Sequence, residues 1–176
     1  VSSFAGQYET VLKVPANQAV FNAIRKCWAS YFSTHAVAYR RDNKMDDEGL
    51  AVIIQTMLFP IRSGVLFGIN PISGSWQEMV VESHPGLGEQ VVGGRVIPDS
   101  YRVRRPRRLP PPLRRFAARF RLRSIETLER THSPLLEKDL IALCRMGLKA
   151  ERRFGSPQDL EWAQTADGRI WVLQSR

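Results

Sequence analysis

The spacing of apolar residues predicts two helices near the start of the chain. The repeating apolar positions are Val20, Phe21, Ile24, Trp28, Tyr31 and Phe32. Such residues recur every three or four positions between Asn17 and Arg41, which is the spacing of one helix face. Ser33 has a side chain that caps helices, so we expect a second helix to begin there. The polar stretch 42–49 then predicts a loop.

A block rich in β-branched and apolar residues follows and predicts several strands. Residues 50–59 are apolar enough for a buried strand, which the proline and glycine of 60–64 should end. Residues 65–69 predict a second strand, which a turn at 70–74 should end. Residues 76–82 predict a third strand, and 91–97 another. The pattern of this block is therefore that of a sheet rather than of a helical bundle.

The end of the chain predicts an amphipathic helix and then a β-hairpin. Residues 135–154 place leucines and Met146 on or near one stripe, and Gly155 should end that helix. Asp167-Gly168 lies between two alternating runs, which is the signal of a two-residue hairpin loop. With that loop, Glu161 faces Gln174, and residue 159 faces residue 176.

Side chains alternate across a strand, so the predicted hairpin has two different faces. The apolar face, which we expect to pack on the core, holds Leu160, Trp162, Trp171 and Leu173. The polar face holds Asp159, Glu161, Gln174 and Arg176. Carboxylate and amide oxygens suit Mg²⁺, and a guanidinium can clamp a phosphate. The alternative is a solvent-facing hairpin with an ordinary cross-strand ion pair, and the hairpin alone favours this alternative.

Composition indicates one soluble globular domain. Hydrophobic residues make up 43% of the 176 residues and charged residues 24%, which is ordinary for that class. Apolar runs stay below the roughly 18 residues that span a bilayer, and the N-terminus lacks the features of a signal peptide. Cys27 and Cys144 are too few for a disulfide framework, so we expect buried thiols in a reducing cytoplasm. The first residue is Val1, which suggests a start inside a longer protein.

The net charge of +9 comes from one segment. Residues 102–123 hold ten arginines and no acidic residue. They could bind nucleic acid or an acidic surface, and 113–122 could form a basic amphipathic helix for anionic membranes. Among the possible roles of this segment, we rank a solvated or domain-docking loop first, docking onto an absent partner domain second, and nucleic-acid binding third.

Several stretches in order resemble one family, the phosphoenolpyruvate synthases and pyruvate phosphate dikinases together with the rifampin phosphotransferases. The resemblance covers nearly the whole chain except about 100–134. The matching motifs are Ser3 to Thr10, Cys27 to Phe32 with Ala38-Tyr39-Arg40, Val52 to Met57, Ser63 to Phe67 with Asn70-Pro71, Gly86 to Glu89, Gly155 to Trp162, and Leu173 to Arg176.

The resemblance implies an α+β fold in which 1–176 form one ATP-grasp-like nucleotide-binding domain, mostly antiparallel sheet with flanking helices. That domain is partial, because the family's phosphate-binding Lys and Arg lie upstream of the first motif. The implied parent is a cytoplasmic enzyme that passes a phosphoryl group from ATP through a phosphohistidine domain to pyruvate. The alternative parent is a rifampin phosphotransferase. We expect the isolated chain to bind nucleotide weakly and to be inactive.

The resemblance also implies roles for single residues. Arg176 matches a catalytic phosphate clamp, and Glu161 and Gln174 match ligands of Mg²⁺. The implied nucleotide-binding residues are Gln55 and Met57 at adenine, Gly6 over the phosphates, Glu89 near the ribose or an interdomain contact, and Asp159. As alternatives, Gln55 and Met57 are plain sheet residues and Gly6 is a turn residue.

Some positions depart from the family. Gly68 stands where Thr is usual, which predicts a weaker polar contact, and His35 stands where Arg is frequent. His35, His84 and His132 lie outside the setting of a phosphocarrier histidine, so we expect structural or surface roles for them. A degenerate structural domain is a third hypothesis, and the complete polar set of the hairpin argues against it.

Overall fold

The computed structural model describes residues 7–44, 49–88, 91, 94, 96–105, 125–129, 132 and 134–176. The chain divides into two compact units, Val1–Met57 and Leu58–Arg176. In the described residues, no helix is both long enough and apolar enough to cross a membrane.

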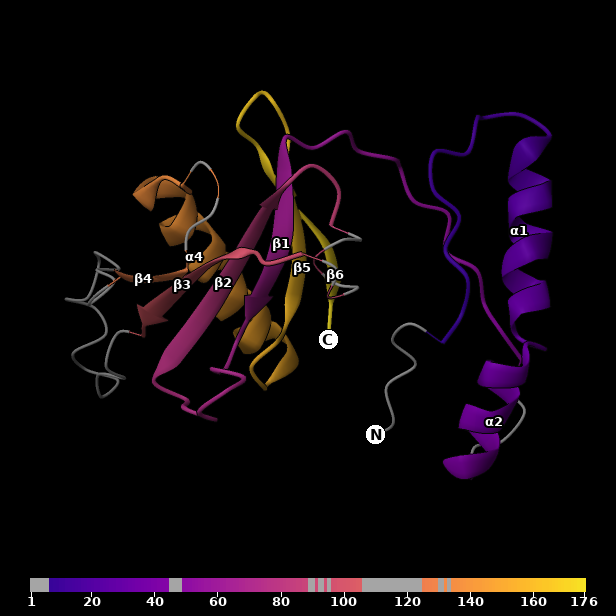
Figure 1. Cartoon of the computed structure of the whole chain (residues 1–176), viewed down its shortest axis with the longest axis horizontal. Coiled ribbons are helices and arrows are strands. Elements are labelled where there is room, and N and C mark those ends of the chain that lie inside the picture. Colours follow the sequence, from indigo (N-terminus) through magenta and orange to yellow (C-terminus); the bar gives the residue numbers. More distant parts are fainter. Residues whose placement is uncertain are drawn as a thin grey trace. The chain divides into compact units, whose positions relative to one another are not determined.

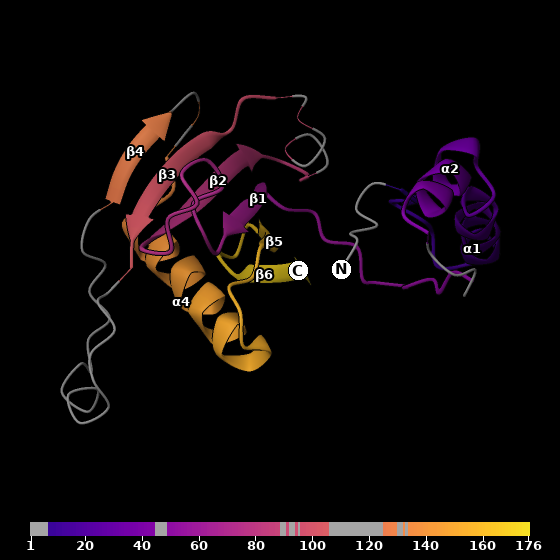
Figure 2. The same cartoon turned by 90° about the horizontal axis from the view of Figure 1, so that it is seen from below.

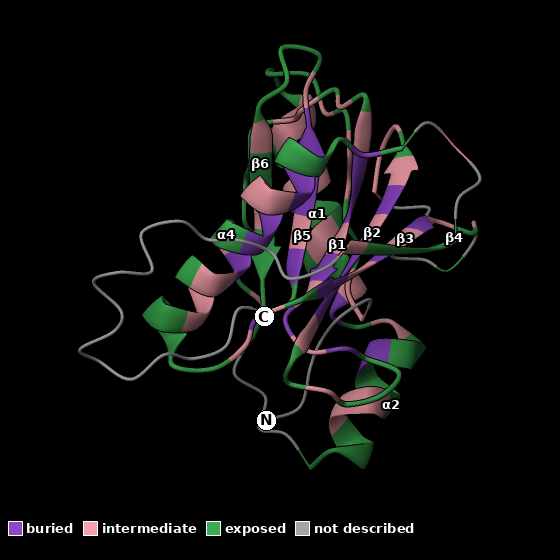
Figure 3. Ribbon diagram, turned by 90° about the vertical axis from the view of Figure 1, so that its left-hand side faces the viewer, coloured by how far each residue is buried: buried purple, intermediate pink, exposed green. Residues whose placement is uncertain are grey.

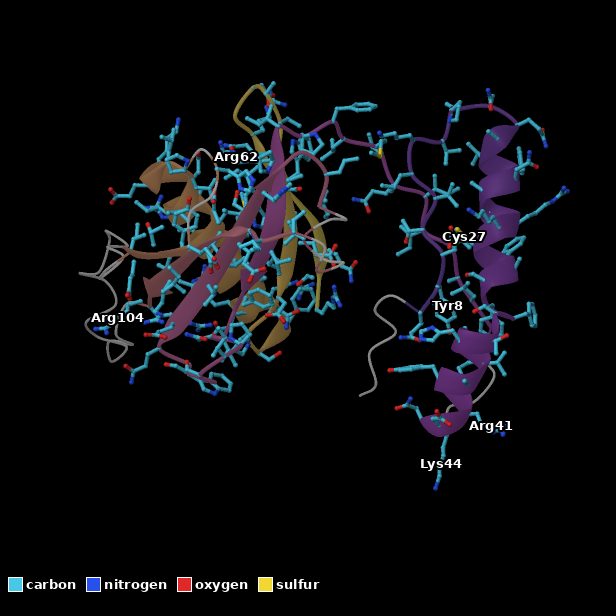
Figure 4. All side chains as sticks on the ribbon, in the orientation of Figure 1. Tyr8, Cys27, Arg41, Lys44, Arg62 and Arg104 are labelled. Carbon is cyan, nitrogen blue, oxygen red and sulfur yellow. The ribbon has the colours of Figure 1, made fainter. Side chains whose placement is uncertain are left out.

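The first unit contains the two predicted helices, α1 (Ala19–Ser30) and α2 (Thr34–Asp42). The Ser33 hydroxyl accepts a hydrogen bond from the Ala36 N–H at 3.2 Å, so the predicted cap of α2 is confirmed. Tyr31 lies between the helices and is buried. Its ring stacks on Tyr8, which lies beside the helix pair in Figure 4, and the Arg40 guanidinium covers it at 3.7 Å. This aromatic contact holds the helix pair together.

The predicted strand at 50–59 is wrong. These residues form no strand, and Ile53 and Phe59 are 85% and 75% exposed. A strand needs a neighbouring edge for its backbone hydrogen bonds, and none of the described residues provides one here. Ile53, Ile54 and Phe59 of this run therefore lie exposed, as do Trp28 and Phe32 of the helix pair.

The second unit is a six-stranded antiparallel sheet in the order β4-β3-β2-β1-β5-β6 (Figure 1). The strands are β1 (Arg62–Phe67), β2 (Glu78–Pro85), β3 (Asp99–Arg104), β4 (Ile125–Glu129), β5 (Leu160–Gln164) and β6 (Ile170–Ser175). The predicted strand at 91–97 is absent from its described residues 91, 94, 96 and 97. Strand β3 begins at Asp99, and β4 lies within the segment of about 100–134 that the family resemblance does not cover. The α+β class is confirmed.

Two local features shape the central strands. Asn70 forms the predicted turn after β1, because its side-chain oxygen accepts the N–H groups of Ile72 and Ser73 at 3.0 and 3.1 Å. Gly64 lies so close to β2 that an added β-carbon would stand 1.8 Å from the Glu82 carbonyl oxygen. Glycine at this position therefore permits the close approach of β1 and β2.

Helix α4 (Glu137–Phe154) covers one face of the sheet (Figure 2). It ends at Gly155, whose φ of 82° is the left-handed conformation of a helix C-cap, as predicted. The core between helix and sheet is made by Leu66, Met79, Val81, Tyr101, Val103, Leu135, Leu140, Leu143, Cys144, Leu160 and Trp162. Figure 3 shows buried residues concentrated in the central strands. In the part of this unit that the structure describes, no helix covers the opposite face of the sheet (Figure 2), and Glu82 and Glu161 lie on that face.

Candidate functional site

Strands β5 and β6 form the predicted C-terminal hairpin and pair as expected at their open end. Glu161 is the Cα partner of Gln174. Asp159 and Arg176 exchange two backbone hydrogen bonds, N to O, of 2.7 and 3.0 Å. Both predicted cross-strand pairs are therefore confirmed.

The predicted loop of this hairpin is wrong. The Thr165 N–H donates to the Arg169 carbonyl at 3.0 Å, which leaves the three residues 166–168 as the loop. A two-residue type I′ turn needs positive φ at both central positions, and in this loop Gly168 has it whereas Asp167 does not. The register near the loop is thus one residue away from the prediction. A β-bulge between Glu161 and Trp162 restores it at the open end.

The shifted register near the loop also changes which side chains face the core. Leu160 and Trp162 are buried, as predicted. Trp171 pairs with Ala163 instead of lying on the face of Trp162, and it is 43% exposed, so its predicted core position is wrong. The reason is that a shift of one residue moves a side chain to the other face of the sheet.

The open end of the hairpin brings the predicted polar residues together. The Arg176 guanidinium contacts the Glu161 carboxylate at 2.5 Å, with the two side chains 39% and 23% exposed. Gln174 lies opposite Glu161 and is exposed. The Asp159 carboxylate accepts the Gly68 N–H at 3.2 Å. These four residues, named here the hairpin cluster, thus present two carboxylates, an amide and a guanidinium at one end of the sheet.

Glu82 of β2 lies on the same face of the sheet as the hairpin cluster. The register links them, because Ser63 pairs with both His84 and Ala163, and side chains two positions apart share a face. Glu82 is half-buried, and desolvation raises the pKa of its carboxyl above the ordinary value. Sequence reasoning missed this residue, although an acid directly after the apolar residues 79–81 of β2 could have signalled it.

Gly68 follows β1 and has a steric role that sequence comparison did not suggest. A β-carbon there would lie 2.6 Å from the backbone oxygen and 2.8 Å from the backbone nitrogen of Gln158. The absent side chain lets the two backbones approach, which brings the Gly68 N–H to the Asp159 carboxylate. The carbonyl of Gly68 accepts a hydrogen bond from Arg105.

The four other predicted site residues are not part of the hairpin. Gln55 is exposed and Met57 half-buried, and both belong to the first unit, in the run that forms no strand. Gly6 and Glu89 lie outside the described residues. The structure therefore gathers half of the predicted set at the hairpin.

Metal binding by protein groups alone finds no support in the described ranges. There, no three His, Cys, Asp or Glu side chains are grouped so that they could hold an ion. The hairpin cluster offers two carboxylates and one amide oxygen, which are hard ligands. Such a set suits an ion that also takes oxygens from phosphates, as Mg²⁺ commonly does.

The described arginines of the basic segment are bound to acids within the second unit. Arg102 lies 3.2 Å from Glu126, Arg104 lies 4.0 Å from Glu78, and Arg105 lies 2.6 Å from Glu151. The other seven arginines of 102–123 lie outside the described residues. For the described three, the ion pairs indicate a structural role.

The cysteines and two of the histidines also carried predictions from the sequence. Cys27 and Cys144 are free thiols, Cys27 half-buried and Cys144 buried. The His84 and His132 rings meet edge to face at 4.8 Å, and the backbone N–H of His132 donates to the Asp99 carboxylate at 2.9 Å. These contacts agree with structural roles for the two histidines.

Comparison with known proteins assigns the chain to a family. The family described as "Pyruvate phosphate dikinase, AMP/ATP-binding domain" matches residues 1–176. The rifampicin phosphotransferase of Streptomyces sviceus is 37% identical over 99% of this chain and 21% of its own length. That of Bacillus cereus is 35% identical over the same shares, and the probable phosphoenolpyruvate synthase of Methanothermobacter thermautotrophicus is 34% identical over 99% of this chain and 27% of its own.

The chain therefore spans about a fifth to a quarter of the length of these relatives. The match to the family runs through both compact units and includes the hairpin cluster. This chain belongs to the pyruvate phosphate dikinase family of AMP/ATP-binding domains.

Proposed function

We propose that this chain is the nucleotide-binding part of an ATP-dependent phosphotransferase and that the hairpin cluster binds Mg-ATP. The observation that carries the proposal is the hairpin cluster itself, where the Arg176 guanidinium, the Glu161 carboxylate and Gln174 meet at the open end of one hairpin. Phosphoryl transfer depends mainly on positioning and on neutralising phosphate charge, and these are the groups that do both.

Glu161 and Gln174 are the proposed protein ligands of Mg²⁺. They face each other across the hairpin, so two oxygens are available from neighbouring strands. Mg²⁺ commonly takes only one or two protein ligands and completes its shell with phosphates and water. When bound, the ion neutralises charge on the phosphates.

Arg176 is the proposed phosphate clamp, in the catalytic role. Its guanidinium is paired with Glu161 and partly open to solvent. An exposed ion pair of this kind contributes about 0.2–1 kcal/mol, so releasing it costs little. A phosphate can accept two parallel N–H donors from a guanidinium, which makes the exchange of partners favourable. Asp159 is proposed to contact the nucleotide beside this clamp.

The remaining roles extend the proposal to the rest of the chain. Gln55 and Met57 are assigned to the adenine edge, Gly6 to the phosphates and Glu89 to the ribose or an interdomain contact. Residues 1–176 then form one partial ATP-grasp-like domain, with the basic segment at about 100–134 as a variable part. The family membership of the chain supports these assignments.

We propose that the whole enzyme is cytoplasmic and passes the phosphoryl group through a phosphohistidine domain to pyruvate, as in a phosphoenolpyruvate synthase. Relatives named as probable phosphoenolpyruvate synthases support this reading. A second candidate is a rifampicin phosphotransferase, which the 37% identity with the Streptomyces sviceus protein favours. The acceptor and the phosphohistidine domain belong to other parts of such a protein. Nucleic acid is not a proposed partner.

The test is a titration of the isotope-labelled chain with Mg-ATP, followed by NMR. We expect shifts at 159–161, 174–176 and 55–57 in the wild type and their loss at the hairpin in Arg176→Ala. Arg169→Ala is the matched control, because Arg169 also pairs with an acid of this hairpin, Asp167, at 3.2 Å. A wild type without shifts, or equal losses in both variants, would contradict the proposed function.

A further inference from the structure

We propose that Arg105 and Glu151 are positioning residues for the hairpin cluster, acting through the Gly68 peptide on the Asp159 carboxylate. This inference rests on the proposed function, because it assigns Asp159 to the nucleotide. It concerns residues outside the hairpin that contact no proposed ligand. Their contribution would be to orient a group that does.

A continuous set of contacts joins these residues. The Arg105 guanidinium donates through one terminal nitrogen to Glu151 at 2.6 Å and through the other to the Gly68 carbonyl. On the other side of the same residue, the Gly68 N–H donates to the Asp159 carboxylate at 3.2 Å. Both polar groups of residue 68 are therefore bound, one by Arg105 and one by Asp159.

These contacts join four separate segments of the second unit. Gly68 follows β1, Arg105 follows β3 and Asp159 precedes β5. The antiparallel registers place the ends of β1 and β3 at the end of the sheet where β5 begins. Glu151 belongs to the last turn of α4. The orientation of the Asp159 carboxylate thus depends on a helix and two strands that are distant in sequence.

Burial distinguishes the Arg105–Glu151 ion pair from the pairs of the neighbouring arginines. The Arg105 and Glu151 side chains are 11% and 12% exposed, whereas Arg104 is 65% exposed. Removing one partner of a buried pair leaves an uncompensated charge in a poorly solvated place. The Arg105 Nε is also buried and has no partner among the described residues. The guanidinium is therefore oriented so that its two terminal nitrogens make hydrogen bonds while its Nε makes none with the described residues.

The glycine makes this arrangement possible. The backbones of Gly68 and Gln158 approach so closely that a β-carbon at 68 would meet the Gln158 backbone at 2.6 Å. Asp159 is the next residue, so the same approach places its carboxylate at the Gly68 N–H. That hydrogen bond occupies one carboxylate oxygen, Oδ1, and directs Oδ2 elsewhere. An exposed Asp side chain without this bond would sample several rotamers.

The experiment compares Arg105→Ala, Arg105→Lys, Glu151→Gln and the control Arg104→Ala in the 176-residue chain. Two quantities are measured: the dissociation constant of Mg-ATP, and the NMR signals of the Gly68 amide and the Asp159 carboxylate without ligand. We expect Arg105→Ala to weaken Mg-ATP binding by about tenfold or more, as loss of an orienting partner does at metal sites. It should also move both ligand-free signals.

The other variants separate positioning from folding. Arg105→Lys should bind Mg-ATP more tightly than Arg105→Ala but more weakly than the wild type. The reason is that an ammonium group is a single point charge and lacks the two separate terminal nitrogens with which the guanidinium contacts Glu151 and Gly68. Arg104→Ala should change neither quantity. If Arg105→Ala does not fold, Glu151→Gln replaces it, because the amide keeps the shape and loses the charge. Leu143→Ala in the core serves as a variant destabilised without touching these contacts.

Each outcome decides the inference. If the wild type binds Mg-ATP and Arg105→Ala binds equally well, the positioning role is refuted and the proposed function stands. The role is also refuted if Leu143→Ala, at an equal loss of melting temperature, weakens Mg-ATP binding as much. If the wild type does not bind Mg-ATP, the proposed function fails. The ligand-free signals then decide: joint movement of Gly68 and Asp159 in Arg105→Ala supports the coupling, and unmoved signals overturn it.

Discussion

Replacing Glu161 with Gln separates the hairpin cluster from the stability of the fold. The change removes the charge that Arg176 contacts at 2.5 Å and keeps the size of the side chain. The pair is partly solvated, so its loss should cost about 0.2–1 kcal/mol of unfolding free energy. For a chain of this size the melting temperature should fall by at most about 4 °C.

Mg-ATP should respond very differently to the same change. A ligand at a hundred times its dissociation constant stabilises the folded state by about 2.7 kcal/mol, which raises the melting temperature by roughly 5–10 °C. We expect this rise in the wild type and little of it in Glu161→Gln, because the variant lacks a proposed Mg²⁺ ligand.

The assay is thermal unfolding with and without Mg-ATP, followed by circular dichroism. Asp167→Asn is the control, since it removes the other ion pair of the hairpin, Asp167 with Arg169, far from the open end. A fall of more than about 10 °C without ligand would mean that Glu161 supports the fold. An undiminished rise with Mg-ATP would mean that Glu161 is not part of the site. Either result refutes the reasoning.

Two further predictions concern titratable groups. Burial raises the pKa of the Cys144 thiol to about 12. A thiol reagent at pH 8 should therefore label Cys27 alone in the folded chain and both cysteines after denaturation. Mass spectrometry detects the label, and labelling of Cys144 in the folded chain would contradict the prediction. Desolvation raises the pKa of Glu82 from its ordinary 4.5, so the folded state favours its neutral form. The contribution of Glu82 to the free energy of unfolding is present below pH 4.5 and is lost as the pH rises through the raised pKa. As the pH rises through this range, the free energy of unfolding should therefore fall more in the wild type than in Glu82→Gln. Urea unfolding at several pH values measures this, and parallel pH profiles would show that Glu82 is not desolvated.

Local features of the sequence were sufficient for several elements. The Ser33 cap, the Asn70 turn and the end of α4 at Gly155 each depend on one residue and its near neighbours. The burial of Leu160 and Trp162 follows from alternation along one short strand. The cross-strand pair of Glu161 and Gln174 was predicted correctly, although the predicted loop was one residue too short and the bulge compensated for it.

The sequence by itself determined the α+β class, the C-terminal helix and hairpin, and the polar residues at the open end of that hairpin. Tertiary structure decided which side Trp171 faces, that the run 50–59 lies without a partner strand, and that Glu82 shares a face with Glu161. It also decided that Arg105 and Glu151 reach Asp159 through Gly68. The physical reason is range: caps and alternation act within a few residues, whereas strand neighbours, bulges and buried ion pairs depend on segments that meet only in the folded chain.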